Sequence, residues 1–166
     1  MHSLTETTIR SSFVNASRKT VKDMALPESF DEMTEADWAA LDFYGWRDPK
    51  FARRAYVVVP TLEGGVVGVA LTQAEATPNS RAMCNWCRDV RLPNDVVLWA
   101  AKRAGAAGRR GATVGILACL DFECSHNGRK DPPLPYDGYD MGAARVRRIE
   151  QLMLRTLGFV ESVTAE

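Results

Sequence analysis

Two close pairs of cysteines constrain this chain more than any other feature of its sequence. They are Cys84 and Cys87 in the string MCNWC, and Cys119 and Cys124 in CLDFEC, and the chain has no others. Two residues separate the first pair, as in a zinc knuckle, and four separate the second, about one helical turn plus one residue. Both pairs can therefore reach one point, the second from a helix start. The pattern predicts a tetrahedral Zn2+ ion held by all four thiolates.

Other roles for these cysteines stay open from the sequence alone. A redox CxxC motif would need a βαβ context, which the following residues do not suggest. Structural disulfides need an oxidising compartment, whereas the opening string MHSLTETTIR has no apolar stretch typical of a secretory signal. Buried free thiols are a further alternative. His126 could replace Cys124 as a ligand, although four thiolates already complete a structural site, which favours a solvated histidine.

Length and hydropathy limit the class of protein. The chain has 166 residues, enough for one domain with a moderate core. No stretch approaches the roughly 18 apolar residues of a membrane span. Without a targeting signal, we expect a cytoplasmic protein with no membrane partner, in a reducing compartment that keeps thiols available for metal.

The formal net charge is zero, but charges of opposite sign are separated along the chain. Residues 1–80 have 8 basic and 11 acidic groups, residues 81–130 have 9 and 4, and residues 131–166 have 4 and 6. The excess of positive charge therefore falls on the segment that contains the cysteines. This asymmetry predicts an anionic partner, either a nucleic acid or an acidic protein surface. The alternative is an ordinary solvated face.

Periodicity and turn residues predict the order of the elements. Residues 5–23 fit a helix, and Thr34 with Asp37 fits the start of a second helix, closed by Gly45 and Pro49. The apolar runs 55–59 and 66–71, separated by a turn with Gly64 and Gly65, fit a β-hairpin. Two further strands are expected at 96–101 and 113–118, and a loop at 125–138. A last helix is expected from Asp140 over 141–157, with an apolar stripe and Gly158 as its stop.

These elements predict an α+β fold with a small antiparallel β-sheet, flanking helices and a four-cysteine zinc finger. A knuckle, a hairpin and then a ligand pair at a helix start is the order of a treble-clef finger. We expect residues 1–80 to form N-terminal helices and a hairpin packed on the finger. Residues 81–130 would be the finger itself, and residues 131–166 a loop and C-terminal helix, all within one compact domain.

Several of these strings together resemble a known family. The knuckle MCNWC, the linker KRAGAAGRRG, the string CLDFECS and the upstream DFYGWRDP and AYVVV resemble FBP-type treble-clef proteins, the elongation factor G-binding proteins of the FusB kind. The resemblance covers most of residues 40–130. This chain differs from FusB in lacking a long helical N-terminal domain, since only about 80 residues precede the knuckle. That difference bears on drug resistance more than on binding of the factor.

The resemblance implies a non-catalytic protein that binds elongation factor G or the translating ribosome and helps to release a factor stalled by fusidic acid. It assigns Zn2+ to Cys84, Cys87, Cys119 and Cys124. It also places Trp86 and Phe122 near the partner surface, where they would be apolar anchors surrounded by basic side chains. The alternative for Trp86 is that it simply covers the metal. The basic residues of the linker that it matches are Lys102, Arg103, Arg109 and Arg110.

Two other classes of function are alternatives to this one. The same basic linker could make the protein a zinc-dependent RNA- or DNA-binding protein. An enzyme is not expected, because no catalytic set of serine, histidine and aspartate, or of paired carboxylates, can be assembled from the sequence, and no small-molecule substrate is implied. Of the two histidines, His2 lies at the second position of the chain.

Overall fold

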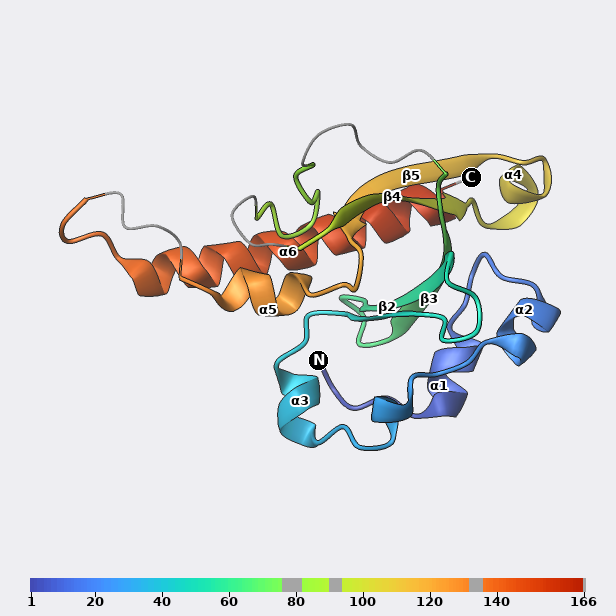
Figure 1. Cartoon of the computed structure of the whole chain (residues 1–166), viewed down its shortest axis with the longest axis horizontal. Coiled ribbons are helices and arrows are strands. Elements are labelled where there is room, and N and C mark those ends of the chain that lie inside the picture. The colour runs from blue at the N-terminus through green and yellow to red at the C-terminus, as the bar shows by residue number, and fades with distance from the viewer. Residues whose placement is uncertain (76–81, 90–93, 132–135, 166) are drawn as a thin grey trace.

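The computed structural model describes residues 1–75, 82–89, 94–131 and 136–165, which form a five-stranded antiparallel sheet with helices on both sides (Figure 1). The strands lie in the order in which they occur in the chain, as a meander. They are β1 (Tyr44–Arg47), β2 (Arg54–Pro60), β3 (Val66–Gln73), β4 (Val96–Lys102) and β5 (Thr113–Cys119). The predicted α+β class with a small antiparallel sheet is confirmed.

The hairpin of β2 and β3 matches the prediction closely. Val57 faces Val69 and Val59 faces Val67 across the two strands. Gly64 has a φ of 83°, a left-handed conformation in which other residues are strained, and the Thr61 N–H donates to the Gly65 carbonyl at 2.9 Å. The turn therefore sets the register that the apolar runs require.

The sheet divides into two parts between β3 and β4. Their described pairing covers only Thr72 with Ala100 and Gln73 with Trp99, whereas β4 and β5 pair over seven positions from Val96–Cys119 to Lys102–Thr113. The hairpin of β4 and β5 therefore departs from the rest of the sheet toward Lys102. Figure 1 shows this hairpin as a separate layer above β2 and β3.

The N-terminal segment occupies the edge of β3 that β4 leaves. Phe13 forms a parallel bridge with Gly68, and the Asn15 side chain accepts from the Ala70 N–H at 2.8 Å. The Asn15 amide also donates to the carbonyls of Ala70 and Lys102, at 3.0 and 2.9 Å. The single helix expected over residues 5–23 is therefore wrong, because these bonds require an extended backbone in its middle.

The segment instead forms two short helices, each with its own N-cap. The Thr5 hydroxyl accepts from the Thr8 N–H ahead of α1 (Glu6–Ser11), and the Ser17 hydroxyl accepts from the Thr20 N–H ahead of α2 (Arg18–Asp23). A 3-10 turn (Glu28–Phe30) and α3 (Glu35–Ala39) follow. The predicted capping box of Thr34 and Asp37 begins α3 and is confirmed.

Two hydrophobic cores lie on opposite faces of the sheet, because side chains alternate along each strand. Tyr56 and Val58 face the N-terminal helices, with Ile9, Trp38 and Trp46 among their neighbours. Val57, Val59 and Val69 face the other way. That second core also contains residues of all three expected segments, from Phe43 through the four cysteines to Leu152 and Val163.

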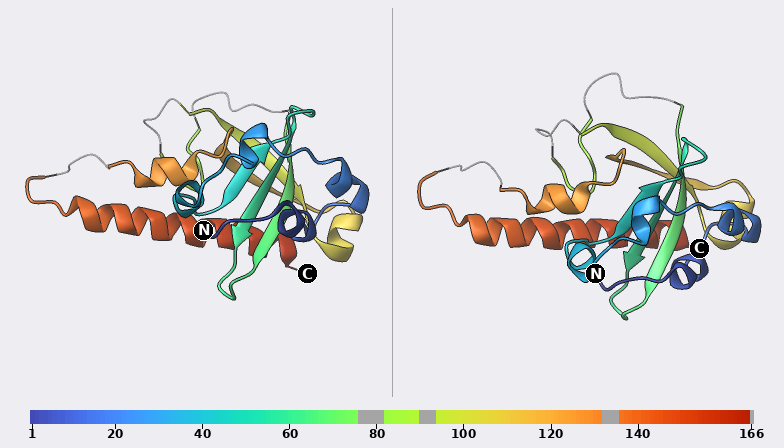
Figure 2. Two further views of the ribbon diagram at one scale, coloured as in Figure 1. Left: turned by 90° about the horizontal axis from the view of Figure 1, so that it is seen from below. Right: turned by 60° about the horizontal axis from the view of Figure 1, so that its bottom comes forward.

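The last helix, α6 (Met141–Thr164), is longer than predicted. The Asp140 carboxylate caps it by accepting from the Ala143 N–H at 2.8 Å, as expected. The predicted stop at Gly158 is wrong, because the helix continues through this exposed position and packs Phe159, Val160 and Val163. Of the predicted stripe, Leu152 is buried but Met153 is 43% exposed. Figure 2 shows the N-terminal half of α6 extending beyond the sheet.

The sequence patterns missed two further short elements and indicated only the start of a third, at the second cysteine pair. Strand β1 lies within DFYGWRDP, where a helix-ending segment was expected. Helix α4 (Gly105–Arg109) folds the glycine-rich linker, and α5 (Cys124–Arg129) occupies the start of the predicted 125–138 loop. Part of that loop, residues 132–135, lies outside the described residues. Within the described residues, no helix combines the length and the apolar character needed to cross a membrane.

Gly68 supports the contact between the N-terminal segment and β3. A Cβ atom at this position would lie 2.5 Å from the Ser12 hydroxyl and 3.1 Å from the Phe13 ring. We expect Gly68→Ala to lower the free energy of unfolding by about 1–3 kcal/mol, because the segment must move away from the strand. Gly65→Ala is the matched control in the same hairpin, because its nearest atom would be 3.6 Å away. Urea denaturation of both variants tests this, and equal stabilities would contradict it.

Candidate metal centre

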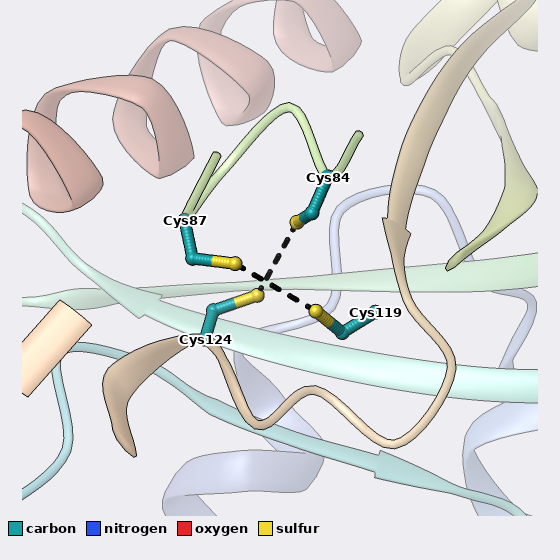
Figure 3. A group of neighbouring side chains, drawn as sticks. All are labelled: Cys84, Cys87, Cys119 and Cys124. Atoms are coloured by element: carbon teal, nitrogen blue, oxygen red, sulfur yellow. Dashed lines mark hydrogen bonds between the residues drawn. The ribbon is translucent and has the colours of Figure 1, made fainter. Parts of the chain in front are cut away.

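Four cysteines from three places in the fold converge on one point. Cys84 and Cys87 flank a tight turn, Cys119 ends β5, and Cys124 begins α5. The turn is held against the sheet because the Asn85 N–H donates to the Leu117 carbonyl at 2.8 Å. Figure 3 shows the four side chains pointing inward toward each other. The first pair flanks a turn, as a knuckle requires. The second pair was expected at a helix start, and of its two members only Cys124 begins a helix, whereas Cys119 ends a strand.

The sulfur atoms are spaced as a tetrahedral metal site requires. All four Sγ atoms lie within 4.8 Å of one another, with Cys84 and Cys124 separated by 3.6 Å and Cys87 and Cys119 by 3.7 Å. A tetrahedron with zinc–sulfur bonds of about 2.3 Å has sulfur–sulfur edges of about 3.8 Å. All four cysteines are free, and these separations are far longer than a disulfide bond of about 2.05 Å. The disulfide alternative is therefore wrong.

The environment of the thiols is buried and polarised. None of the four cysteines is more than 7% exposed. Hydrogen bonds from Cys119, Cys124 and Cys87 lower the pKa of Cys84, while hydrogen bonds with Cys119, Cys84 and Cys87 raise the pKa of Cys124. A thiolate at one sulfur is thus stabilised by hydrogen bonds from the neighbouring thiols. Several thiolates at this distance would repel one another, and a cation at the centre would remove that repulsion.

Asn127 is a residue of this centre that the sequence patterns did not indicate. It lies on α5, three residues after Cys124, and is 1% exposed. Its side-chain amide donates to the Sγ atoms of Cys87 and Cys119, at 3.8 and 3.7 Å. Donors to ligand sulfurs stabilise the thiolate form and orient the ligands. The only sequence signal was its position one helical turn after a cysteine.

His126 stands apart from the four thiols. Its side chain is exposed on α5, and it is absent from the group of neighbouring ligand atoms in the described chain. The predicted alternative ligand set with His126 in place of Cys124 therefore gains no support, since Cys124 itself is fully buried among the sulfurs.

Trp86 and Phe122 do not form an exposed surface, and their predicted role as apolar anchors for a partner is wrong. Trp86 is 0% exposed, with its ring centroid 5.0 Å from that of Phe43 and 5.7 Å from that of Phe159. Phe122 is 6% exposed and stacks on Trp99 at 5.5 Å. Aromatic side chains beside a small metal site bury large apolar areas, so both complete the core instead.

Basic side chains secure the knuckle and α5 from the side. Arg155 of α6 donates to the Trp86 carbonyl at 2.9 Å, which fixes the turn between Cys84 and Cys87 against the long helix. Arg129 of α5 donates to both carboxylate oxygens of Asp42, at 2.5 and 3.0 Å, and Asp42 is only 8% exposed. The Ser125 hydroxyl also accepts from the Asp42 N–H at 3.0 Å. The helix that carries Cys124 is therefore tied to the chain just before β1.

The basic residues of the linker lie at the other end of β5. Arg109 and Arg110 are exposed at the end of α4, and Lys102 pairs with Thr113, the first residue of β5. The seven residues of β5 separate them from Cys119 by about 20 Å, given about 3.4 Å per residue in a strand. The four linker residues, Lys102, Arg103, Arg109 and Arg110, therefore do not surround the aromatic side chains beside the cysteines, as had been expected for Trp86 and Phe122. They form a separate region of positive charge.

Comparisons with known proteins agree with this description. A family model described as "FBP C-terminal treble-clef zinc-finger" matches residues 8–163. A solved structure titled "Structure of the fusidic acid resistance protein FusC" is similar, with a TM-score of 0.51 and 16% identity over 82% of this chain and 53% of that chain. This chain thus spans about half the length of that protein, and the likeness shows the fold. No curated protein matches.

Arg129 offers a test of how α5 is held in place. Arg129→Gln leaves the buried Asp42 carboxylate without its bidentate partner, so we expect the free energy of unfolding to fall by about 1–3 kcal/mol. Arg147→Gln, an exposed position on α6, is the control and should change stability by less than about 0.5 kcal/mol. Urea denaturation of each variant measures both effects. A stability of Arg129→Gln equal to that of the control would show that the ion pair does not anchor the helix.

Proposed function

Because the chain belongs to the FBP treble-clef zinc-finger family, we propose that it is a non-catalytic zinc protein that binds elongation factor G, alone or on the ribosome. The observation that carries this proposal is the cluster of four buried sulfurs, two of whose separations, 3.6 and 3.7 Å, are close to the edge of a zinc tetrahedron. The family match extends over nearly the whole chain. A role in translation would place the protein in the cytoplasm.

Cys84, Cys87, Cys119 and Cys124 would hold the zinc ion. When bound, the metal supplies a structural cross-link and no reactive position, because four thiolates complete its coordination and leave no place for water. Asn127 would stabilise two of the thiolates through its amide. This closed donor set favours a binding protein over an enzyme.

The metal would join parts of the chain that hydrogen bonds also hold together. The knuckle is bonded to β5 from Asn85 to Leu117 and to α6 through Arg155, and α5 is held through Arg129, Ser125 and a bond from Arg148 of α6 to the Asn127 carbonyl. With zinc bound, the strand end, the knuckle and α5 become one rigid unit beneath α6. Such a unit can present a fixed surface to a partner, because it loses little conformational entropy on binding.

The contact with the factor would use the basic region around α4. Arg103, Arg109 and Arg110 lie there, and Arg109 and Arg110 are exposed. Such a region complements an acidic protein surface and accelerates association by electrostatic steering. The fusidic acid resistance named for FusC belongs to that protein. Release of a stalled factor by this chain is part of the proposal, and it needs a separate assay because the chain spans about half of FusC's length.

Removal of the metal should unfold much of the protein. We expect purified chain to contain about one zinc per molecule. Chelation, or Cys119→Ser, should lower the free energy of unfolding by several kcal/mol, since zinc contributes on the order of 10 kcal/mol to small zinc modules. Thermal denaturation with and without chelator measures this, and added zinc, but not magnesium, should reverse the effect of the chelator. A zinc-free protein with an unchanged melting temperature would contradict the structural role.

Charge reversal on α4 tests the contact with the factor. The double variant Arg109→Glu and Arg110→Glu should weaken binding of elongation factor G about tenfold or more, because like charges across an interface repel. A control with the same net charge is Lys50→Glu with Arg147→Glu, at exposed positions away from α4. Isothermal titration calorimetry with purified factor measures both. If the wild type does not bind, the proposed function is wrong, and if both pairs weaken binding equally, α4 is not the contact.

A further inference from the structure

A basic groove lies where the sheet divides, separate from the cysteine centre. It has a volume of about 520 Å3 and runs between the N-terminal segment and the strands. Among the residues that line it are Asn15, Thr20, Arg54, Thr72, Lys102 and Thr113. None of its described lining residues is acidic, so the groove as described carries only positive charge.

The register of the sheet brings these side chains to one face. Arg54 faces Thr72 across β2 and β3, Thr72 faces Ala100 across β3 and β4, and Lys102 faces Thr113 across β4 and β5. Residues that face each other on neighbouring strands project to the same side, as do residues two apart in one strand. This is the face that Tyr56 and Val58 occupy beneath the N-terminal helices. Where the N-terminal helices no longer cover this face, it carries the basic side chains of Arg54 and Lys102 and the hydroxyl groups of Thr72 and Thr113.

The two cations of the groove have no carboxylate partner among the described residues. Arg54 and Lys102 are both exposed and take part in no ion pair there. The Arg54 guanidinium lies over the Phe51 ring, 4.2 Å from its centroid, which orients it. Asn15 holds the opposite wall through its bonds to Ala70 and Lys102. The groove is thus a built surface with uncompensated positive charge.

Positive charge continues from the groove onto its surroundings. A second hollow of about 480 Å3 lies on the other side of α2 and is lined by Arg18, Lys22 and by Arg10, which pairs with Glu6 at 2.6 Å. Figures 1 and 2 place α2 and α4 at the same end of the molecule, opposite the N-terminal half of α6. Helix α4, which contains Arg109 and is followed by Arg110, therefore lies at the same end of the molecule as α2. A ligand with several spaced phosphates fits this track better than a single small anion.

We infer that this groove binds the sugar–phosphate backbone of RNA. Arginine and lysine with serine, threonine and asparagine side chains are the groups that contact phosphates and sugars in nucleic-acid complexes. Among the described residues that line the groove, Tyr56 is the only aromatic one; it is 2% exposed and cannot stack on a base, so recognition is independent of sequence. The choice of RNA over DNA rests on the proposed function, because a protein at the ribosome meets RNA.

The test is fluorescence anisotropy of the full chain with a labelled 20-nucleotide RNA hairpin, over a range of salt concentrations. The variant Arg54→Gln with Lys102→Gln should bind more weakly. Its slope of log K against log salt should fall by about 1.4–1.8, for two lost phosphate contacts of about 0.7–0.9 each. Arg88→Gln with Arg147→Gln, exposed and outside the groove, is the matched control and should keep the wild-type slope. Arg54→Lys with Lys102→Arg should keep both affinity and slope.

Further measurements distinguish RNA binding from the binding of other ligands and from a loss of folding in the variant. If Arg54→Gln with Lys102→Gln lowers the melting temperature, Thr113→Glu is used as the test variant. It adds a carboxylate to the groove and removes no cation, and it should weaken RNA binding. The inference is overturned if wild-type protein does not bind the RNA, if both glutamine pairs act equally, or if a DNA hairpin of the same sequence binds as tightly. It is also overturned if ATP or an acidic peptide binds the groove in place of RNA. Binding of elongation factor G is measured separately, so either proposal can fail alone.

Discussion

The structure depends on the meeting of four sulfur atoms where a strand ends, a helix begins and a short turn crosses above them. Within 4.8 Å of one another and buried, these thiols cannot all ionise without a cation between them. Asn127 adds a donor to two of the sulfurs, and Trp86 and Phe122 close the core around them. The long helix α6 packs over this centre and, through Arg155, holds the turn in place.

The part of the site that is local in sequence could be predicted, and the part that depends on tertiary packing could not. Cysteine spacing predicted that four thiols meet at one point, and the two valine-rich runs predicted the hairpin, because both signals lie within a few residues. Exposure of Trp86 could not be judged, since its burial depends on Phe43 and Phe159, which are distant in the chain. Likewise, the end of α6 depends on packing of Phe159 to Val163, which overrides the weak helix propensity of Gly158.

The N-terminal segment shows the same limit for secondary structure. Its composition allowed one helix, but Asn15 is bonded to Ala70 and Lys102, which are 55 and 87 residues away. These bonds are available only because β4 departs from β3 after two paired residues. The division of the sheet thus breaks the helix, separates the basic linker from the cysteines and opens the groove beside α2. One end of the molecule thus gathers four buried thiols, and the other exposes basic side chains.

X-ray absorption at the zinc edge of the purified, folded protein tests the central claim most directly. Four equal sulfur neighbours at about 2.3 Å are expected from a closed tetrahedral site. A first shell that contains nitrogen or oxygen would show that His126 or water replaces a thiolate. A folded protein that contains no zinc would contradict the account as a whole.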